Sequence, residues 1–446
     1  MPNMQGREGS VQTSLQAIAK KAESQPGYRF RNLFGMLNEG MLKDSWRYIR
    51  KDAAYGVDRV SAAEYEQNLD ENIHQMVENL KQKRYRAKLV RRRYIPKGNG
   101  KLRPLGIPAT QDKLLQIGVK RILEAIYEQD FLECSFGYRP NVGALDAVDK
   151  LGIRLQFGKF NYMVEADIKS FFDKIDHEWL LKMLAERVDD QALLWLIKKW
   201  LKAGVLDTDG KVLHPETGSP QGGIVSPILA NVYLHYALDL WFEKVVKPHC
   251  SGKACLIRFA DDFVCAFDKQ EDVQRFYEVL GKRLGKFCLE LSAEKTRIIP
   301  FSSTNLPGKT SFDFLGFEFR WGKDRAGKLR IKKRTARKKL RSSLKHLNEW
   351  CKENRHIRLS ELFKQLNAKL RGYYNYYGVI GNYPSLQQFY FGAIKLLIKN
   401  LNRRSQRRSY NMAGYTQLIE QFGTVKPHIV GRPKHKYRMG KGLIMA

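Results

Sequence analysis

Two adjacent acidic residues interrupt one of the most apolar stretches of the chain. The stretch reads CLIRFADDFVCAF, and Asp261 and Asp262 stand at its centre, between segments whose bulky and β-branched residues predict two strands. Burying a carboxylate without a partner costs several kcal/mol, and two neighbouring carboxylates also repel each other. The pair therefore predicts a hairpin whose tip needs cationic partners, and it indicates a role in chemistry rather than in stability.

A third acidic residue with a similar placement lies about 95 residues upstream. In YMVEADIKSFFDKIDH a predicted strand ends at Asp167, and a loop leads to a helix that starts near Asp176. Carboxylates from the two strands can meet. Because neighbouring residues of a strand point to opposite faces, we expect Asp167 and Asp261 to contact metal directly and Asp262 to support one of them. Such a cluster suits two-metal phosphoryl transfer with Mg²⁺, whose charge keeps several carboxylates ionised together.

Three further stretches carry residue types that a nucleotide site uses, although each also has a purely structural explanation. GSPQGGIVSPILANVYLHYALD predicts a loop that opens an amphipathic helix, in which Gly222 and Gly223 let the backbone approach a nucleotide or only cap a core helix. IPKGNGKLRP predicts a hairpin with Lys97 and Arg103 on facing strands, where they grip a triphosphate or form a solvated basic surface. Lys295 in LELSAEKTRIIPF either lies near a leaving pyrophosphate or is an ordinary exposed lysine.

Positive charge is concentrated in the last third of the chain. The formal net charge is +33, yet residues 1–320 hold 49 Lys and Arg against 41 Asp and Glu, whereas residues 321–446 hold 30 against five. A nearly balanced body with a basic C-terminal third indicates a catalytic core joined to a module that binds a polyanion. A basic solubilising surface and an anionic membrane surface are the alternatives.

Other features of the composition bear on location. The sequence has no stretch of 18 apolar residues and no signal-peptide core, and its six cysteines include no CxxC pair. Reduced structural thiols are therefore favoured over disulfides or a metal site. We expect a soluble, cytoplasmic protein that does not enter a membrane.

Seven blocks, in their order along the chain, resemble those of a reverse transcriptase of the group II intron-encoded kind. The blocks are IPKGNGKLRPLGIP, SFGYRPN, EADIKSFFDKIDH, SPQGGIVSPILANVYLHYALD, RFADDFV, LELSAEKT and FDFLGFEF, and the resemblance covers roughly residues 30–410. Seven ordered blocks are far more specific than any one of them. The resemblance implies an α+β right-hand polymerase, with fingers and a palm that contains an antiparallel sheet, followed by an α-helical thumb or maturase domain.

The resemblance also implies roles for residues that match the family's blocks. The residues that match its metal site are Asp167, Ile168, Asp261 and Asp262, of which the three aspartates are catalytic. Those that match its nucleotide site are Lys97, Arg103, Phe172, Gln221 and Lys295. Those that match its primer contacts are Phe259, Phe314, Leu315 and Gly316. Phe172 matches the steric gate that rejects a 2′-hydroxyl. Phe259 stands where tyrosine is usual, so stacking on the primer end is kept while one polar contact is lost.

The predicted domains follow the same order. Residues 1–80 form an N-terminal extension, residues 81–320 form fingers and palm, residues 321–410 form the thumb, and residues 411–446 form a basic tail that is a candidate DNA-binding segment. Beyond residue 325 we expect long basic helices. One of them carries an apolar face of Leu340, Leu344, Leu347 and Cys351. Five tyrosines within LNAKLRGYYNYYGVIGNY either stack on bases or pack between helices.

The activity that the resemblance implies is RNA-directed DNA synthesis from dNTPs with two Mg²⁺ ions, for which Mn²⁺ can substitute. The implied partners are intron RNA or another RNA template, a DNA primer and target DNA, and the implied roles are splicing and retrohoming. The chain ends without room for the metal-dependent endonuclease that such proteins often carry. We therefore expect a nicked, single-stranded or replication-fork DNA to serve as the target primer.

Other functions stay open at this point. One is a domesticated enzyme of DNA repair or phage defence, which the absence of a group II ribozyme around the reading frame would support. Another is an RNA-binding splicing factor without polymerase activity, which the intact set of aspartates argues against. Phe172 disfavours an RNA-dependent RNA polymerase. The sequence leaves both a monomer and a homodimer open.

Overall fold

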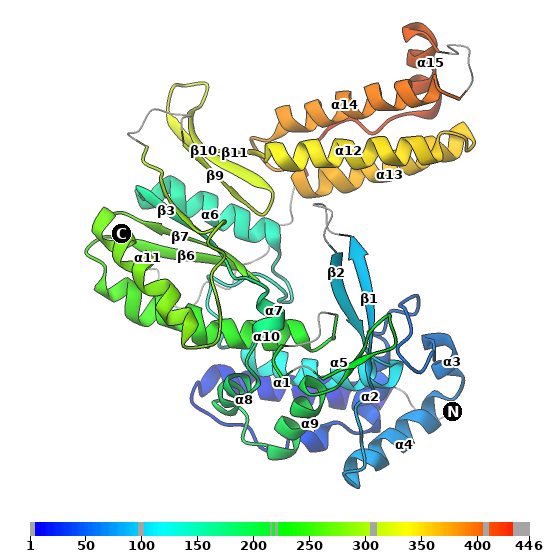
Figure 1. Ribbon diagram of the computed structural model, residues 1–446, viewed down its shortest axis with the longest axis vertical. Coiled ribbons are helices and arrows are strands. Elements are labelled where there is room, and N and C mark those ends of the chain that lie inside the picture. The colour runs from blue at the N-terminus through cyan, green and yellow to red at the C-terminus, as the bar shows by residue number, and fades with distance from the viewer. Residues whose placement is uncertain are drawn as a thin grey trace. The chain divides into compact units, whose positions relative to one another are not determined.

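The chain folds into two compact units, residues Met1–Ser302 and Ser303–Ala446 (Figure 1). The computed structural model describes residues 5–96, 102–214, 216–218, 222–303, 310–404 and 410–430. Among the described residues, the first unit combines helices with two β-sheets and the second combines helices with one.

Helices from the N-terminal part of the first unit surround the central helix α5 (Thr110–Tyr127), as Figure 1 shows. The helices α1 (Gln5–Ser24) and α2 (Glu39–Trp46) contact α5 directly, and α4 (Leu69–Lys81) packs on α2. The short helix α3 (Ala62–Gln67) begins after Ser61, which forms a capping box with Glu64. The predicted helix cap at Ser61 is thereby confirmed. Most of α5 is buried, so apolar contacts hold these helices together.

A four-stranded antiparallel sheet stands beside these helices. Its strands are β3 (Tyr162–Asp167), β6 (Ala254–Phe259), β7 (Asp262–Phe267) and β8 (Arg297–Pro300), in the order β6-β7-β3-β8. The helix α6 (Ala144–Gly158) packs on β6, and α11 (Gln270–Gly285) packs on β3 and β7. Residues 263–267 of β7 are all buried, because the strand is central and helices cover it. The apolar run around the two aspartates is therefore a hairpin, as the sequence predicted.

Four more helices complete the first unit. They are α7 (Phe171–Lys174), α8 (His177–Ala185), α9 (Gln191–Leu201) and α10 (Ser226–Leu234), and α10 continues into π-helical turns at His235–Asp239 and Phe242–Val246. Single 3-10 turns occur at Phe34–Met36 and Lys247–His249. The sequence predicted α8, and it placed Pro227 correctly in the first turn of α10. The prediction that α10 is amphipathic was wrong, because all of its residues except Pro227 are buried.

The predicted hairpin near residue 100 is present and belongs to a second sheet. Strands β1 (Val90–Pro96) and β2 (Leu102–Ile107) pair antiparallel, and the short strands β4 (Val205–Leu206) and β5 (Val212–Leu213) extend the sheet in the order β2-β1-β4-β5. Arg103 lies opposite Ile95 in this register. Lys97, predicted to face Arg103, lies outside the described residues.

The second unit begins with strands, and the last of them lies beyond residue 325, where the sequence predicted helices. Strands β9 (Ser311–Phe314), β10 (Phe317–Lys323) and β11 (Leu329–Thr335) form an antiparallel sheet in the order β11-β10-β9. The expectation of helix from residue 325 was wrong for β11, because a turn with Gly327 at φ +78° returns the chain to pair with β10. The predicted boundary at residue 321 falls inside β10. The division into fingers, palm and thumb stays a prediction.

Four helices follow, and their packing explains most of the predicted tyrosine cluster. They are α12 (Arg337–Asn354), α13 (Leu359–Tyr377), α14 (Tyr383–Leu401) and α15 (Met412–Phe422), and α14 contacts both α12 and α13. Leu347 and Cys351 are buried on α12, as expected. Tyr373, on α13, stacks on Phe389 with the two ring centroids 3.6 Å apart. Of the five tyrosines, only Tyr383 is largely exposed, so packing between helices accounts for the cluster better than base stacking does.

Two further expectations concern the whole of the described chain. All six cysteines are free thiols. Within the described ranges, none of the helices combines the length and the apolar character that crossing a bilayer requires.

Candidate active site at the end of the four-stranded sheet

The end of the four-stranded sheet brings the three predicted carboxylates together. Asp167 is the last residue of β3 and Asp262 the first of β7, and the two are direct partners in the antiparallel register. Asp261 occupies the turn between β6 and β7. Directly opposed residues place their Cβ atoms about 5 Å apart, so their carboxylates lie within reach of one ion. The prediction that acids from two strands meet is confirmed, and which of them contacts a metal directly stays a prediction.

Burial, together with neighbouring negative charge, raises the pKa of two of these carboxyls. Loss of hydration raises the pKa of Asp261, and the neighbouring Asp167 adds to the effect. Asp262 is open to solvent on one side, yet surrounding protein displaces enough water from its carboxyl, with Asp261 and Asp167 beside it, to raise its pKa to about 7. Because these carboxyls resist full ionisation, added positive charge stabilises the cluster.

The protein itself supplies one positive charge to this cluster. Lys295 Nζ lies 2.7 Å from Asp167 Oδ2, and a hydrogen bond to that carboxylate raises the pKa of the ammonium. The Lys295 side chain is 64% exposed, whereas that of Asp167 is 16% exposed. The lysine can therefore leave the aspartate for another anion at little cost in packing. Its predicted place near the active site is consistent with this contact.

Lys295 reaches the site because its segment is bonded to the end of β3. The Ser292 amide donates to the Asp167 carbonyl at 2.8 Å, and the Lys169 amide donates to the Glu290 carbonyl at 2.8 Å. Ile168, between them, is buried and forms a β-bridge with Leu291. The assignment of Ile168 to the metal site stays a prediction.

Aromatic side chains stand beside the acids. Phe172, in α7, is half-buried and meets the Tyr138 ring edge to face, with centroids 6.1 Å apart. Burial raises the pKa of Tyr138, the charge of Asp261 raises it further, and Arg103 lowers it. Tyr138 thus experiences the charges of both Asp261 and Arg103. The sequence predicted no role for Tyr138. Its position within the SFGYRPN block is the feature of the sequence that could have indicated one.

The loop predicted to hold a nucleotide is anchored to the segment that carries Phe172. The buried His177 Nε2 bonds the Gly218 carbonyl at 2.7 Å, and the Gly218 amide donates to the Ile175 carbonyl at 2.8 Å. Gly222 has φ +111°, and a Cβ there would collide with the Gly106 carbonyl. Position 222 therefore requires glycine, because the backbone there passes close to β2. Gln221 lies outside the described residues.

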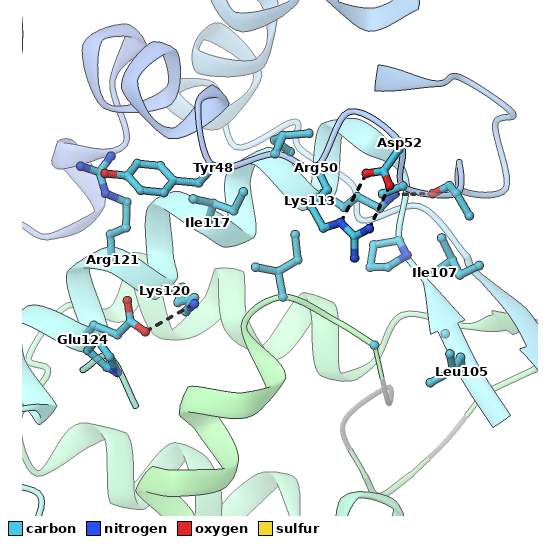
Figure 2. Close-up of a pocket in the computed structure, with 18 of the residues that line it drawn as sticks. Tyr48, Arg50, Asp52, Leu105, Ile107, Lys113, Ile117, Lys120, Arg121 and Glu124 are labelled. Carbon is cyan, nitrogen blue, oxygen red and sulfur yellow. Dashed lines mark hydrogen bonds and ion pairs between the residues drawn. The ribbon is translucent and has the colours of Figure 1, made fainter. Parts of the chain in front are cut away.

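A cavity of about 1330 Å³ adjoins this loop (Figure 2). It is lined by α1, the 48–54 segment, β2 and α5, and it extends to Gly222. Its cationic lining residues are Arg50, Arg93, Lys113, Lys120 and Arg121. Figure 2 shows Arg50 paired with Asp52, at 2.9 Å, and Lys120 paired with Glu124, at 3.4 Å. Leu105, Ile107 and Ile117 also line it, so the cavity combines apolar surface and positive charge.

The predicted primer contacts fall in two places. Phe259 ends β6 opposite Asp262, in the first unit. Phe314 ends β9 in the second unit, and Leu315 and Gly316 form the turn to β10, where both have positive φ, as a type I′ hairpin turn requires. The Tyr376 hydroxyl donates to the Leu315 carbonyl at 2.9 Å. Contact of either group with a primer stays a prediction.

The donor set of the acidic cluster has the chemistry that a divalent ion needs. Mg²⁺ takes oxygen ligands and is commonly bound by one or two carboxylates together with substrate phosphates. Among the residues that the structure describes, no group of three or more His, Cys, Asp or Glu side chains could hold a metal ion by itself. Burial, with the charges of Asp261 and Asp167, raises the pKa of Asp262 to about 7 although Lys295 lowers it. The cluster therefore fits an ion that shares its ligands with a substrate.

Comparison with known proteins identifies the family. Residues 95–319, half of the chain, match the family model described as reverse transcriptase (RNA-dependent DNA polymerase), whose members use divalent metal ions. The chain is 31% identical over 404 residues to the group II intron-encoded protein LtrA of Lactococcus lactis subsp. cremoris, a match that covers 72% of this chain and 65% of that protein. The chain thus spans slightly less than two thirds of the length of that relative.

Other relatives agree with this match. The chain is 30% identical over 348 residues to protein YkfC of Escherichia coli K12, covering 70% of this chain and 89% of that protein. It is also 33% identical over 170 residues to a putative COX1/OXI3 intron 1 protein of Saccharomyces cerevisiae, covering 38% and 20% of the two chains. The predicted resemblance and the α+β polymerase fold are confirmed. The chain belongs to the reverse transcriptase (RNA-dependent DNA polymerase) family and, within it, is similar to group II intron-encoded proteins.

Proposed function

We propose that this protein is an RNA-directed DNA polymerase that extends a primer with deoxynucleotides. The observation that carries the proposal is the juxtaposition of Asp167 and Asp262 across β3 and β7, with Asp261 in the adjoining turn. This cluster lies within the residues that match the reverse transcriptase family. Its excess of negative charge is suited to chemistry that uses cations.

The surrounding residues have distinct tasks in the proposed reaction. Two Mg²⁺ ions, for which Mn²⁺ can substitute, would activate the primer 3′-hydroxyl and stabilise the leaving pyrophosphate. The three aspartates would hold these ions. Arg103 binds the triphosphate through its planar guanidinium, and Lys295 moves from Asp167 to the leaving group. Phe172 and Tyr138 form the aromatic wall against the sugar, where a 2′-hydroxyl does not fit.

The cavity of Figure 2 supplies a path for the single-stranded template in this proposal. A groove that combines cationic and apolar side chains binds nucleic acid through its phosphates and bases without reading the sequence. The cavity has both kinds of lining and extends to Gly106 and Gly222, beside the proposed nucleotide loop. Arg50 and Lys120 are paired with carboxylates of the protein, and phosphates of the template can replace these carboxylates as their partners.

We further propose that the RNA partner is a group II intron and that the protein supports its splicing and retrohoming. This proposal rests on the similarity to the group II intron-encoded protein LtrA and on the basic residues 321–446. Binding of the intron RNA should weaken steeply with salt, because it releases counterions from phosphates. An intron RNA that splices equally well with and without the protein would contradict the splicing role and leave the polymerase proposal intact.

The polymerase proposal is tested by primer extension on an RNA template with dNTPs and Mg²⁺. Wild-type protein should extend the primer, and Asp262→Asn should lower the rate at least about 10³-fold, because it removes a charge that the reaction requires. The matched control is Glu271→Gln, which removes an exposed carboxylate at the start of α11. Equal extension by wild type and Asp262→Asn would refute the proposed site.

A further inference from the structure

The turn that carries Asp261 has an unfavourable backbone conformation. Ala260 has φ +56°, in the left-handed region that residues with a Cβ seldom adopt. Strain of this kind persists only where surrounding contacts determine the conformation, and it concentrates at functional sites. Ala260 is itself buried, so the contacts that hold it come from the protein interior.

Two contacts determine the conformation of Ala260. On its amide side, the backbone at Gly137 lies so close that a Cβ at that position would collide with the Ala260 nitrogen. On its carbonyl side, Arg258 Nη1 donates a hydrogen bond to the Ala260 oxygen at 3.0 Å. The turn is therefore held from both ends, by a loop and by a side chain.

The guanidinium of Arg258 is completely buried and uses every donor that it has. Nε and Nη2 bind the two carboxylate oxygens of Asp239 at 2.8 and 2.5 Å. The second Nη2 hydrogen is directed at Ser135 Oγ, at 2.7 Å, and the second Nη1 hydrogen at Asn231 Oδ1, at 3.1 Å. A guanidinium has five N–H groups in one plane, so these four bonds and the bond to Ala260 fix its orientation.

Asn231 joins the two contacts into one network. Its Nδ2 donates to the Gly137 carbonyl at 2.7 Å, while its Oδ1 accepts from Arg258. The Arg258 backbone also bonds the 134–136 segment, through its amide to Cys134 and its carbonyl to Phe136. The loop before Tyr138, the buried helix α10 and the hairpin tip are thereby held by one set of bonds.

We propose that Arg258 is a positioning residue for the reaction: anchored by Asp239 and Asn231, it holds the left-handed turn at Ala260 and so directs the Asp261 carboxylate. The inference rests on the proposed polymerase function. The competing explanation is that Arg258 and Asp239 form only a structural ion pair. The two differ in a testable way, because a buried ion pair can be replaced by apolar residues of similar size without loss of stability.

The test is the double variant Arg258→Met with Asp239→Leu in the full chain. It removes both buried charges together, so no unpaired charge is left in the core. The matched control is Arg187→Met with Asp130→Leu, which replaces another buried pair of the same unit, whose Arg187 Nε lies 3.2 Å from Asp130 Oδ2. Thermal unfolding, primer extension on an RNA template, and Mn²⁺ binding followed by EPR are measured on each protein.

A positioning role predicts a specific combination of results. The Arg258/Asp239 variant stays folded, yet its kcat falls roughly 10²-fold, as expected for a displaced catalytic group. Its affinity for Mn²⁺ falls as well, while the KM for template and primer is unchanged. The Arg187/Asp130 control keeps the kcat and the Mn²⁺ affinity of wild type. Wild-type kcat and Mn²⁺ affinity in a folded Arg258/Asp239 variant would overturn the proposal.

A second variant keeps the test decisive if the double variant does not fold. Asn231→Ala retains the Arg258–Asp239 pair and removes only the links to Arg258 Nη1 and to the Gly137 carbonyl. It should lower kcat and Mn²⁺ affinity together while the protein stays folded, and unchanged values would overturn the proposal. Failure of wild-type protein to extend any primer would instead refute the proposed function, a separate outcome.

Discussion

Lys295 and Asp167 are 128 residues apart in the sequence, yet Lys295 Nζ lies 2.7 Å from Asp167 Oδ2. The pair joins the segment before β8 to the last residue of β3, at the point where the three aspartates gather. Because the Lys295 side chain is 64% exposed, the pair contributes little to stability. Its place beside the acidic cluster supports the proposed role of Lys295 in the reaction.

Replacing Lys295 by methionine should lower kcat for primer extension by roughly 10²-fold, the usual contribution of a positioned acid–base group. The KM for template and primer should change little, because the ammonium acts on the leaving group. Steady-state kinetics on an RNA template measures both. The matched control is Lys169→Met, which removes a similarly exposed lysine whose partner is Glu290, 3.3 Å away. Equal loss in both variants would show that general positive charge, not Lys295, matters.

Phe172→Ala should relax the discrimination between deoxyribonucleotides and ribonucleotides. Removing the ring opens space beside Tyr138, where the sugar 2′-position is proposed to lie. The ratio of kcat/KM for a dNTP over that for the matching NTP should fall roughly 10- to 100-fold. Single-nucleotide incorporation measures the ratio, and Phe172→Tyr, which keeps the ring, serves as the control. An unchanged ratio in Phe172→Ala would place the gate elsewhere.

Local sequence signals were sufficient for much of the site. The apolar run around Asp261 and Asp262 predicted the hairpin, and the strand that ends at Asp167 was also correct. These predictions succeeded because a carboxylate inside an apolar run has few explanations other than a strand end or a functional site. The sequence also predicted that Asp167 meets Asp262, because carboxylates at the ends of two strands can stay ionised together when they share cations.

Contacts between distant segments were out of reach of the sequence. Tyr138 approaches the acids only because the backbone at Gly137 lies against Ala260, and no local pattern encodes that approach. Gly222 looked like a nucleotide-binding glycine, but its neighbour in the structure is the backbone of Gly106. The strand β11 is rich in lysine and arginine, so composition favoured helix, and pairing with β10 decided the outcome.

Gly316→Ala should destabilise the hairpin that the second unit contributes to the predicted primer contact. Gly316 has φ +80°, and a Cβ would lie 2.9 Å from the Tyr377 hydroxyl, so backbone strain and crowding add to about 1–3 kcal/mol. Hydrogen exchange of β9 and β10 should become faster. The control is Gly372→Ala in α13, where a Cβ meets nothing within 4 Å and alanine favours the helix. Unchanged exchange in Gly316→Ala would contradict the turn geometry.

The buried carboxyl of Asp112 should make stability depend on pH. Asp112 accepts hydrogen bonds from the Tyr85 hydroxyl, at 2.7 Å, and from the Lys88 amide, at 3.0 Å. Burial still dominates and raises its pKa from 3.8 to about 6. Between pH 4 and 6 the folded protein therefore keeps a proton that the unfolded chain has lost. The free energy of unfolding should fall as pH rises through this window, by on the order of 3 kcal/mol from this group.

Asp112→Asn isolates this contribution, because the amide does not ionise. Urea unfolding of wild type and variant at pH 4 and pH 7 gives the two differences in unfolding free energy. The variant should gain on wild type by on the order of 3 kcal/mol between the two pH values, since only wild type must ionise a buried carboxyl as pH rises. Glu271→Gln, at an exposed site, corrects for the general effect of removing one negative charge. A difference that stays constant with pH would mean that the hydrogen bonds from Tyr85 and Lys88 fully offset the burial of Asp112.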